Sequence, residues 1–253
     1  MPADQLYLDH AATTPLLAVA RDALVQGFAL WANPSSPHKA GRTARSALED
    51  ARARIAAALG WEGEIAFTSG ASEALSLAIN CCRDPLLGVS STEHEAVLRH
   101  AGGAVRIAVD SSGQVDPEHA ALGGLVAVQQ VNNETGVIQP LNDIVTAVHA
   151  AGGLLLADCA QGAGKCALPD ADLIAIAAHK FGGPIGVGAL LVRDWAMLRP
   201  VGGQERGYRA GTENLPGVLA MVAALEAGTD WLAEAARLRA LLERQIVESG
   251  GEV

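Results

Sequence analysis

The stretch "DLIAIAAHKFGGPIGVGALLVR" (residues 172–193) contains two apolar runs separated by a glycine-rich segment. The runs at 172–177 and 188–193 are continuous in hydrophobicity, which is typical of strands covered on both faces. The segment between them is too short for a helical crossover, so the two strands are predicted to be antiparallel. Lys180 lies in this segment and has two interpretations: a lysine whose amine reaches solvent, or an amine nucleophile held in a pocket.

Five more apolar runs precede this pair. They are also predicted to be strands: "EIAFT" (64–68), "LLGVS" (86–90), "AVRIAV" (104–109), "LVAVQQV" (125–131) and "GLLLAD" (153–158). Amphipathic spacing predicts one helix over 44–59, ending at Gly60, and another over 141–153. This alternation indicates a mainly parallel α/β sheet with right-handed crossovers. A long C-terminal helix is predicted to dock on its own domain through an apolar face formed by Trp231, Ala235, Leu238, Leu242 and Ile246.

Composition limits the possible functions. The 253 residues carry a net charge of −10, which argues against nucleic acid as a partner, because phosphate backbones bind clustered Lys and Arg. The N-terminus has no signal-peptide pattern and no apolar run approaches the roughly 18 residues of a membrane span, so we expect a cytoplasmic protein with no membrane partner. The spacing of the four cysteines predicts neither a metal site nor a disulfide framework: Cys81, Cys82, Cys159 and Cys166.

Polar residues follow several of the predicted strands. Ligands of open α/β sheets bind at the carboxyl ends of strands, so these residues are expected to gather at one edge. They are His94, Asn133, Asp158, Gln161, His179 and Lys180. Nearby, "TSGASEA" begins a helix near Ala71 whose free N–H groups suit a phosphate. Each residue has an ordinary explanation as a cap, turn or core residue, but together they match pyridoxal phosphate, which requires a reactive lysine, a carboxylate and a phosphate seat.

The chain resembles the cysteine desulfurases, in the class V branch of the fold-type I pyridoxal-phosphate enzymes. The resemblance rests on eight blocks in the family's order: "YLDHAATTP", "NPSSPHKAGR", "FTSGASEALSLAI", "TEHEAVL", "VNNETGVIQP", "ADCAQGAGK", "AHKFGGPIGVGALLV" and "GGQERGYRAGTENLPG". It implies an α/β fold, a three-layer αβα large domain with a mainly parallel, seven-stranded mixed sheet. Residues 1–15 are then an N-terminal segment, 16–225 the cofactor-binding large domain, and 226–253 a helix leading to a small domain absent from this chain.

The resemblance also implies roles for the residues at the sheet edge. Lys180 would bond covalently to the cofactor and act with His94 in catalysis. Asp158 would pair with the pyridine nitrogen, and His94 would stack on the ring. Gln161 would hydrogen-bond the phenolic oxygen, with Asn133 near that oxygen and the substrate carboxylate.

The cofactor phosphate would be held from two subunits. Ala71, Ser72 and His179 would contribute from one chain and Thr212 from its neighbour, so the resemblance implies a homodimer with shared active sites. Three positions depart from the family pattern. Ser72 replaces the usual threonine but keeps the hydroxyl, Ala177 replaces a phosphate-binding serine, and a usual "GPKG" is interrupted by Ile185.

The implied activity removes sulfur from L-cysteine, leaving L-alanine and an enzyme-bound persulfide for a sulfur-acceptor or scaffold protein in iron–sulfur cluster assembly. The family's nucleophilic cysteine lies in the small domain, and none of the four cysteines matches its motif, so all four are predicted to be packing residues. This form is therefore expected to hold the cofactor but to transfer no sulfur. Two alternatives remain: another class V lyase or aminotransferase, or a non-catalytic subunit or fragment that retains the fold.

Overall fold

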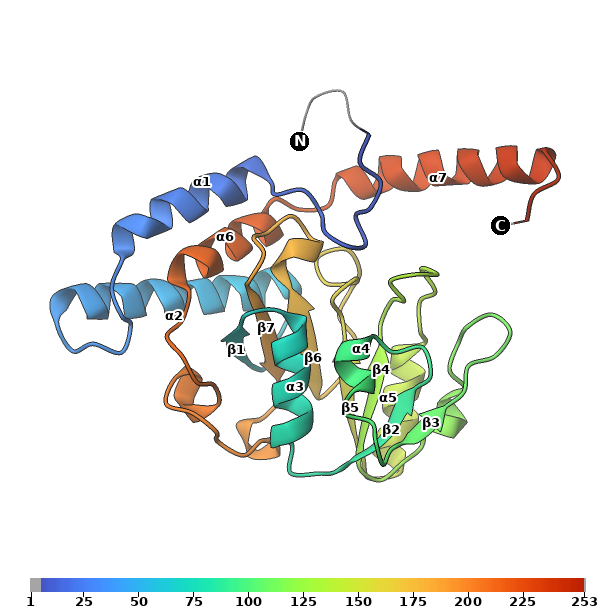
Figure 1. Ribbon diagram of the computed structural model, residues 1–253, viewed down its shortest axis with the longest axis horizontal. Coiled ribbons are helices and arrows are strands. Elements are labelled where there is room, and N and C mark those ends of the chain that lie inside the picture. The colour runs from blue at the N-terminus through green and yellow to red at the C-terminus, as the bar shows by residue number, and fades with distance from the viewer. Residues whose placement is uncertain (1–5, 253) are drawn as a thin grey trace.

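A seven-stranded sheet runs through the computed structural model, which describes residues 6–252 (Figure 1). Its strands are β1 (Glu64–Thr68), β2 (Leu86–Ser90), β3 (Val105–Ile107), β4 (Leu125–Gln129), β5 (Leu154–Asp158), β6 (Leu173–Ala177) and β7 (Gly188–Val192). They lie in the order β1-β7-β6-β5-β4-β2-β3. The pairs from β3 to β6 are parallel, whereas β7 is antiparallel to β6 and β1. This is the predicted mixed, mainly parallel sheet.

The antiparallel β6–β7 pair is confirmed, with Ile174 opposite Leu191 in register. Two predicted strands are shorter than expected by two or more residues. The run at 104–109 keeps only the three residues of β3, an edge strand that pairs with β2 alone. The run at 125–131 ends as a strand at Gln129, because the following residues pair locally with the next turn, through a bridge between Val131 and Ile138.

Helices connect and cover the strands. They are α1 (Ala18–Gly27), α2 (Lys39–Leu59), α3 (Ala71–Cys81), α4 (Glu95–Leu98), α5 (Leu141–Ala150), α6 (Leu215–Glu226) and α7 (Trp231–Glu248). Short 3-10 turns are η1 (Phe28–Leu30), η2 (Pro117–Ala120), η3 (Ala178–Lys180), η4 (Trp195–Met197) and η5 (Glu205–Gly207). Gly60 ends α2 in a left-handed conformation with φ of 63°, as its position predicted.

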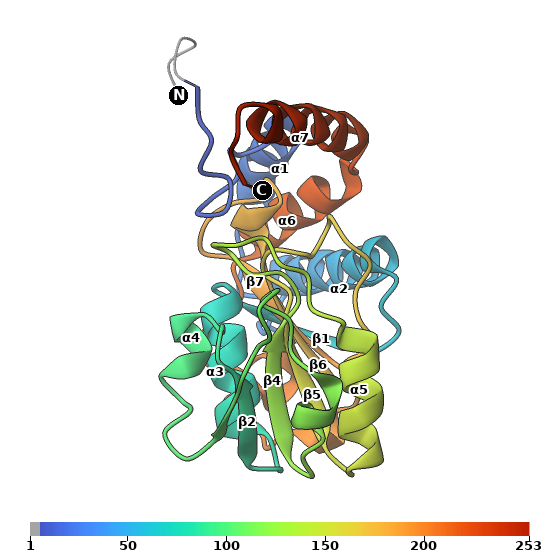
Figure 2. The ribbon, with the colours of Figure 1, turned by 90° about the vertical axis from the view of Figure 1, so that its right-hand side faces the viewer.

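Each face of the sheet has its own hydrophobic core. Along β6, Leu173 and Ala175 contribute to one core, whereas Ile174 and Ile176 contribute to the other. Helices α3 and α4 cover the first face, and α2, α5 and α6 cover the second (Figure 2). Side chains alternate along a strand, so burial on both faces requires the continuous apolar runs seen in the sequence.

Helix α7 projects away from the rest of the chain (Figure 1). None of its residues is buried, and Trp231 and Leu242 are 54% and 57% exposed. The prediction that this helix docks on its own domain is therefore wrong. The chain turns between the helices, where Gly228 has a φ of 76°, and the axes of α6 and α7 differ by 65°, so α7 leaves the domain instead of packing along it.

Within residues 6–252, no single helix is both long and apolar enough to cross a membrane. Helices α6 and α7 meet such a criterion only when they are counted together across their bend. The predicted domain limits at residues 15 and 225 stay a prediction.

Candidate active site

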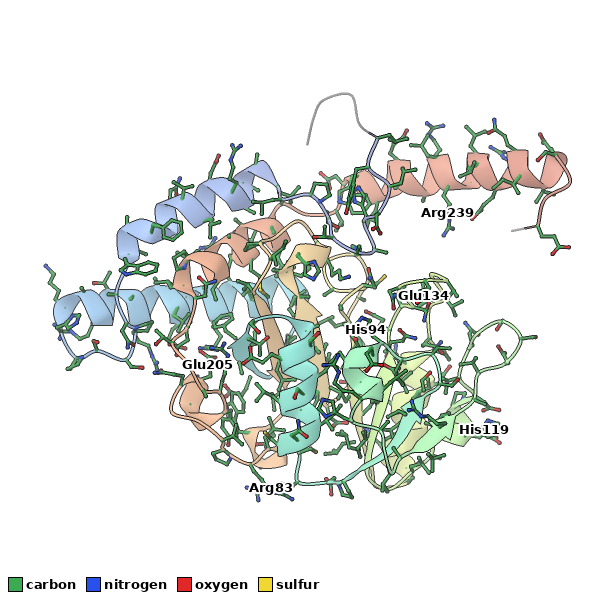
Figure 3. All side chains as sticks on the ribbon, in the orientation of Figure 1. Arg83, His94, His119, Glu134, Glu205 and Arg239 are labelled. Atoms are coloured by element: carbon green, nitrogen blue, oxygen red, sulfur yellow. The ribbon has the colours of Figure 1, made fainter. Side chains whose placement is uncertain are left out.

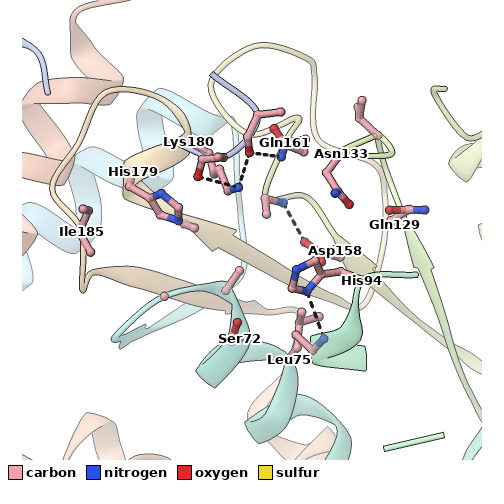
Figure 4. Close-up of a pocket in the computed structure, with 18 of the residues that line it drawn as sticks. Ser72, Leu75, His94, Gln129, Asn133, Asp158, Gln161, His179, Lys180 and Ile185 are labelled. Atoms are coloured by element: carbon pink, nitrogen blue, oxygen red, sulfur yellow. Dashed lines mark hydrogen bonds between the residues drawn. The ribbon is translucent and has the colours of Figure 1, made fainter. Parts of the chain in front are cut away.

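A cavity of about 690 Å³ opens at the carboxyl ends of the central strands. Most of the residues predicted for the site line it (Figure 4): Ala71, Ser72, His94, Asn133, Asp158, Gln161, His179 and Lys180. Thr212 is exposed on the loop between η5 and α6 and is outside the cavity lining. The strand-end argument therefore located the cavity correctly, and the contribution of Thr212 to a second chain stays a prediction.

Asp158 is the last residue of β5 and is buried at the wall of the cavity. Its Oδ1 accepts a hydrogen bond from the Ala160 amide at 2.9 Å. Burial raises the pKa of Asp158, while the Ala160 amide, His94 and Lys180 act in the opposite direction. A buried carboxylate at a cavity wall favours a ligand that brings a cationic N–H group.

His94 caps the short helix α4 and lies beside Asp158 (Figure 4). Its Nδ1 accepts a hydrogen bond from the Ala96 amide at 3.1 Å. In a neutral imidazole the proton is then on Nε2, so the cap fixes both the tautomer and the orientation of the ring. The sequence predicted a ring at this edge, and the cap explains how it is held.

Lys180 ends the turn η3 that follows β6. Its Nζ donates hydrogen bonds to the carbonyl oxygens of Ala11 and Ala12, the latter at 3.2 Å. Burial lowers the pKa of Lys180, and the negative charges of Asp158 and Asp9 oppose that shift. The amine is thus held inside the cavity with a weakened preference for the charged form, which is what a nucleophilic lysine requires.

The N-terminal segment at residues 9–14 covers this lysine. The Thr14 hydroxyl donates to the Lys180 carbonyl at 2.8 Å, and the Thr14 amide donates to the His179 carbonyl at 2.8 Å. Gln161 Nε2 donates to the Ala11 carbonyl at 2.8 Å. The block "YLDHAATTP" was noted in the sequence, but its covering role was missed, because no local pattern reveals which distant carbonyl groups a lysine will reach.

His179 is half-buried at the same place. Its Nδ1 lies 3.1 Å from the Thr13 hydroxyl. Burial lowers the pKa of His179, and the neighbouring Lys180 charge lowers it further. A neutral imidazole with a fixed ring can donate or accept a hydrogen bond at the cavity wall, which suits the predicted contact with a phosphate.

The N-terminus of α3 forms one end of the cavity. Gly70 has a φ of 148°, which favours glycine, and it packs against Gly188 of β7. A Cβ on Gly188 would lie 2.6 Å from the Gly70 Cα, so the absence of a side chain lets α3 begin directly on the sheet. The amides of Ala71 and Ser72 belong to the first helical turn, which has no preceding turn to bond with, so they can bind an anion.

Two glutamates near the cavity were missed by the sequence analysis. Glu73 accepts the Ser69 amide and pairs with Arg209 at 2.9 Å. The N-cap of α3 is Gly70, so the serine or threonine of the usual capping box is absent and no local pattern marked this glutamate.

Glu93 precedes His94 and is buried. Its Oε1 accepts the Gln129 amide at 2.6 Å, and burial together with Asp158 raises the pKa of Glu93 to about 8. No local sequence signal marks a buried carboxyl in a polar turn.

The cysteines divide into two groups. Cys81, Cys82 and Cys159 are buried, as expected of packing residues, and burial raises the pKa of each thiol. Cys166 is exposed, so its prediction as a packing residue is wrong, because it lies in the turn beyond β5 rather than under a helix. Cys166 is not part of the cavity lining.

In the part of the chain that the structure describes, no cluster of His, Cys, Asp and Glu side chains could hold a metal ion.

The arrangement fits the chemistry of pyridoxal phosphate. A buried carboxylate at Asp158 suits a protonated ring nitrogen, and the imidazole of His94 lies next to it. The amine of Lys180 lies in the same cavity, and the first turn of α3 offers amides to a phosphate. Ala177 also lines the cavity, so the hydroxyl expected at that position in the family is absent.

Comparisons with known proteins identify a family and several similar proteins. The model of the aminotransferase class-V family matches residues 6–249. A cysteine desulfurase from Cereibacter sphaeroides is 39% identical over 251 residues, covering 88% of this chain and 65% of the relative. The cysteine desulfurase IscS of Anaeromyxobacter sp. is 37% identical, covering 94% and 67%. A solved structure of SspA in complex with cysteine matches with a TM-score of 0.86 at 29% identity, covering 95% and 78%. The chain thus spans about two thirds of the length of these curated relatives.

Proposed function

The chain belongs to the aminotransferase class-V family, and from this premise we propose that it binds pyridoxal 5′-phosphate and removes sulfur from L-cysteine, as a cysteine desulfurase or as the cofactor-binding part of one. The observation that carries the proposal is the meeting of Lys180, Asp158 and His94 in one cavity beside the start of α3. The relatives named cysteine desulfurase and the structure of SspA in complex with cysteine support L-cysteine as the substrate.

Pyridoxal phosphate, when bound, supplies an aldehyde carbon that reacts with amines and a ring that accepts electrons from the α-carbon of an amino acid. The residues of this chain would hold and direct that chemistry. Nζ of Lys180 would provide the reacting amine and take the proton from the α-carbon, because its pKa is lowered by burial. The carboxylate of Asp158 would keep a proton on the ring nitrogen, and the imidazole of His94 would cover one ring face.

The phosphate would be bound by the amides of Ala71 and Ser72, by the Ser72 hydroxyl and by His179. Gln161 and Asn133 would orient the polar groups of the ring and the substrate. Thr212 would reach the phosphate of a second copy of the chain, in a homodimer.

We assign no sulfur acceptor among the four cysteines. Three of them are buried, and Cys166, the exposed one, is outside the cavity lining.

Borohydride trapping tests the proposal. The chain has three lysines, Lys39, Lys165 and Lys180, so the site of a reduced cofactor adduct can be assigned by peptide mass spectrometry. We expect the adduct on Lys180 alone and its loss in Lys180→Ala. Lys165 is a matched control, because burial also lowers its pKa, and Lys165→Ala should keep the adduct. A reducible adduct that survives Lys180→Ala contradicts the proposal.

Product analysis separates the proposed reaction from the alternatives. With L-cysteine and a small thiol added to reduce any persulfide back to the thiol and release its outer sulfur as sulfide, a desulfurase yields alanine and sulfide in equal amounts. A lyase or an aminotransferase would yield a keto acid in place of alanine. Binding of L-cysteine without products would support the cofactor-binding part of a desulfurase.

A further inference from the structure

Glu93 is buried in the turn between β2 and α4, immediately before His94, with 6% of its surface exposed. Its Oε1 accepts the amide of Gln129, the last residue of β4, at 2.6 Å. Its Oε2 is also buried and has no hydrogen-bond partner among residues 6–252. An ionised carboxylate in this environment is strongly disfavoured, whereas the neutral acid avoids most of that cost.

The neighbouring charges act in the same direction. Asp158, from β5, is the charged group that acts on Glu93, and it opposes ionisation. Gln129 and Asp158 are partners in the β4–β5 register, so the two carboxyl groups belong to the same edge of the sheet. His94 and Lys180 favour a negative charge on Asp158. Two carboxyl groups at such a site share one charge rather than carry one each.

The turn that carries Glu93 is tied to β4 by more than one bond. Gln129 Nε2 donates to the Thr92 hydroxyl at 3.0 Å, and Asn132 Nδ2 donates to the Thr92 carbonyl at 3.1 Å. Together with the bond from the Gln129 amide to Glu93, these contacts fix the backbone from which His94 extends. A change at Glu93 should therefore be felt at His94 without any contact between Glu93 and a ligand.

We propose that Glu93 is a positioning residue: as a neutral carboxylic acid it anchors the turn that carries His94, and it leaves the negative charge of the pair on Asp158. The raised pKa of Glu93, about 8, agrees with this role. The proposal rests on the proposed function in one respect only: the negative charge of Asp158 is used to pair with a cationic ring nitrogen. The protonation state of Glu93 is a property of the chain alone and can be measured without cofactor.

The first test compares the stability of the cofactor-free chain with that of Glu93→Gln, which keeps the acceptor for the Gln129 amide but cannot ionise. The folded chain binds one more proton at Glu93 than the unfolded chain does, between the ordinary pKa of 4.5 and about 8. The stability that this proton contributes is fully present below pH 4.5 and is lost as the pH rises to about 8. The quantity to follow is a ratio: the unfolding equilibrium constant of the wild type divided by that of Glu93→Gln. This ratio should rise about tenfold per pH unit across this window and then level off.

A ratio that stays constant from about pH 5 to pH 9 overturns the proposal. Glu95→Gln is the matched control, since Glu95 lies two residues away with its side chain 69% exposed, and its ratio should stay flat. If Glu93→Gln fails to fold, infrared spectra of the wild type labelled with carbon-13 glutamate decide the question. A protonated glutamic acid carbonyl band near pH 6 that disappears by about pH 9.5 is expected, and its absence near pH 6 overturns the proposal.

The positioning role is tested by cofactor affinity. At pH 7, Glu93→Gln should bind pyridoxal phosphate within about twofold of the wild type, whereas Glu93→Ala, which frees the Gln129 amide, should bind at least about tenfold more weakly. Equal affinity in wild type and Glu93→Ala overturns the positioning role. A wild-type chain that binds no cofactor contradicts the proposed function instead, while the pH titration still decides the protonation state of Glu93.

Discussion

Glu73 and Arg209, 136 positions apart in the sequence, form an ion pair of 2.9 Å that joins the first turn of α3 to the loop before α6. Glu73 also accepts the Ser69 amide. Partial burial works against its ionisation, but the Ser69 amide and the Arg209 guanidinium together lower the pKa of Glu73. A negative charge therefore lies beside the amides that we propose for a phosphate, and Arg209 offsets it.

Arg209→Ala should weaken the binding of pyridoxal phosphate by roughly five- to tenfold, because the charge of Glu73 then opposes the phosphate without compensation. Pyridoxal, which has no phosphate, should bind equally well to both forms. Adding Glu73→Gln to Arg209→Ala should recover part of the loss. Arg237→Ala, which removes an exposed ion pair with Glu234 on α7, serves as the control. An equal loss for pyridoxal and its phosphate would show that the pair merely stabilises the loop.

Glu205 (Figure 3) lies in η5, just before the same loop, and forms a buried ion pair at 2.8 Å with Arg52 of α2. Glu205 Oε2 also accepts the Phe67 amide at 2.9 Å. Glu205→Ala should lower the free energy of unfolding by about 3–5 kcal/mol, because it leaves the Phe67 amide without its acceptor and leaves the buried Arg52 charge with only the more exposed Glu49 as a counter-charge.

The control lies two residues along the same helix. Arg54 pairs with Glu226 at 2.6 Å, with both side chains more than 40% exposed, so Glu226→Ala should cost at most about 1 kcal/mol. Urea unfolding of the two variants provides the comparison. Similar losses of stability in both variants would show that burial does not set the strength of these two ion pairs.

Gly188→Ala tests the close contact between α3 and the sheet. The new Cβ would clash with the Ile176 carbonyl oxygen and lie 2.6 Å from the Gly70 Cα, so the start of α3 must shift. We expect a loss of about 1–3 kcal/mol in stability and weaker binding of phosphate-bearing ligands. Gly203→Ala has open space at its Cβ and should change neither property. Unchanged phosphate binding in Gly188→Ala would mean that the phosphate lies elsewhere.

The sheet could be predicted from the sequence because its signals are local. The continuous apolar runs predicted all seven strands, and the short link after β6 predicted the antiparallel direction of β7. The pairing of β1 with β7 could not be predicted in this way, since strand order depends on contacts far apart in sequence. Helix α7 has an apolar face in the sequence, but such a face does not specify what it contacts.

The candidate site divides in the same way. His94, Asp158 and Lys180 could be located because each lies at or just after the end of a strand and parallel strands end at one edge. Glu93 could not be found, because its importance comes from burial against Gln129 and Asp158. The carbonyl groups that accept from Lys180 also escaped prediction, as the contact spans 168 and 169 positions.

Asp158→Asn separates holding the cofactor from activating it. The amide keeps the shape of the side chain but cannot stabilise a proton on the ring nitrogen, so exchange of the α-hydrogen of a bound amino acid should fall by about a hundredfold or more. The cofactor should remain detectable on the chain. Asp172→Asn is the control, because Asp172 is also buried but bonds the Leu155 amide at the opposite end of β5. Normal exchange in Asp158→Asn would remove the role proposed for this carboxylate.

Ala177→Ser adds, at the end of β6, the hydroxyl that the resemblance to cysteine desulfurases implies there. Ala177 lines the cavity with 2% of its surface exposed, so a hydroxyl there is removed from water and needs a partner. Without ligand, the variant should be less stable than the wild type by about 1 kcal/mol. With pyridoxal phosphate, a hydrogen bond to the phosphate should reverse this order and tighten binding roughly three- to tenfold. Ala178→Ser is the control, because Ala178 is buried in the core outside the cavity lining and should lose stability with or without the ligand. If Ala177→Ser were destabilised equally with and without pyridoxal phosphate, the phosphate would not lie beside the end of β6, and the seat proposed at α3 would need to be revised.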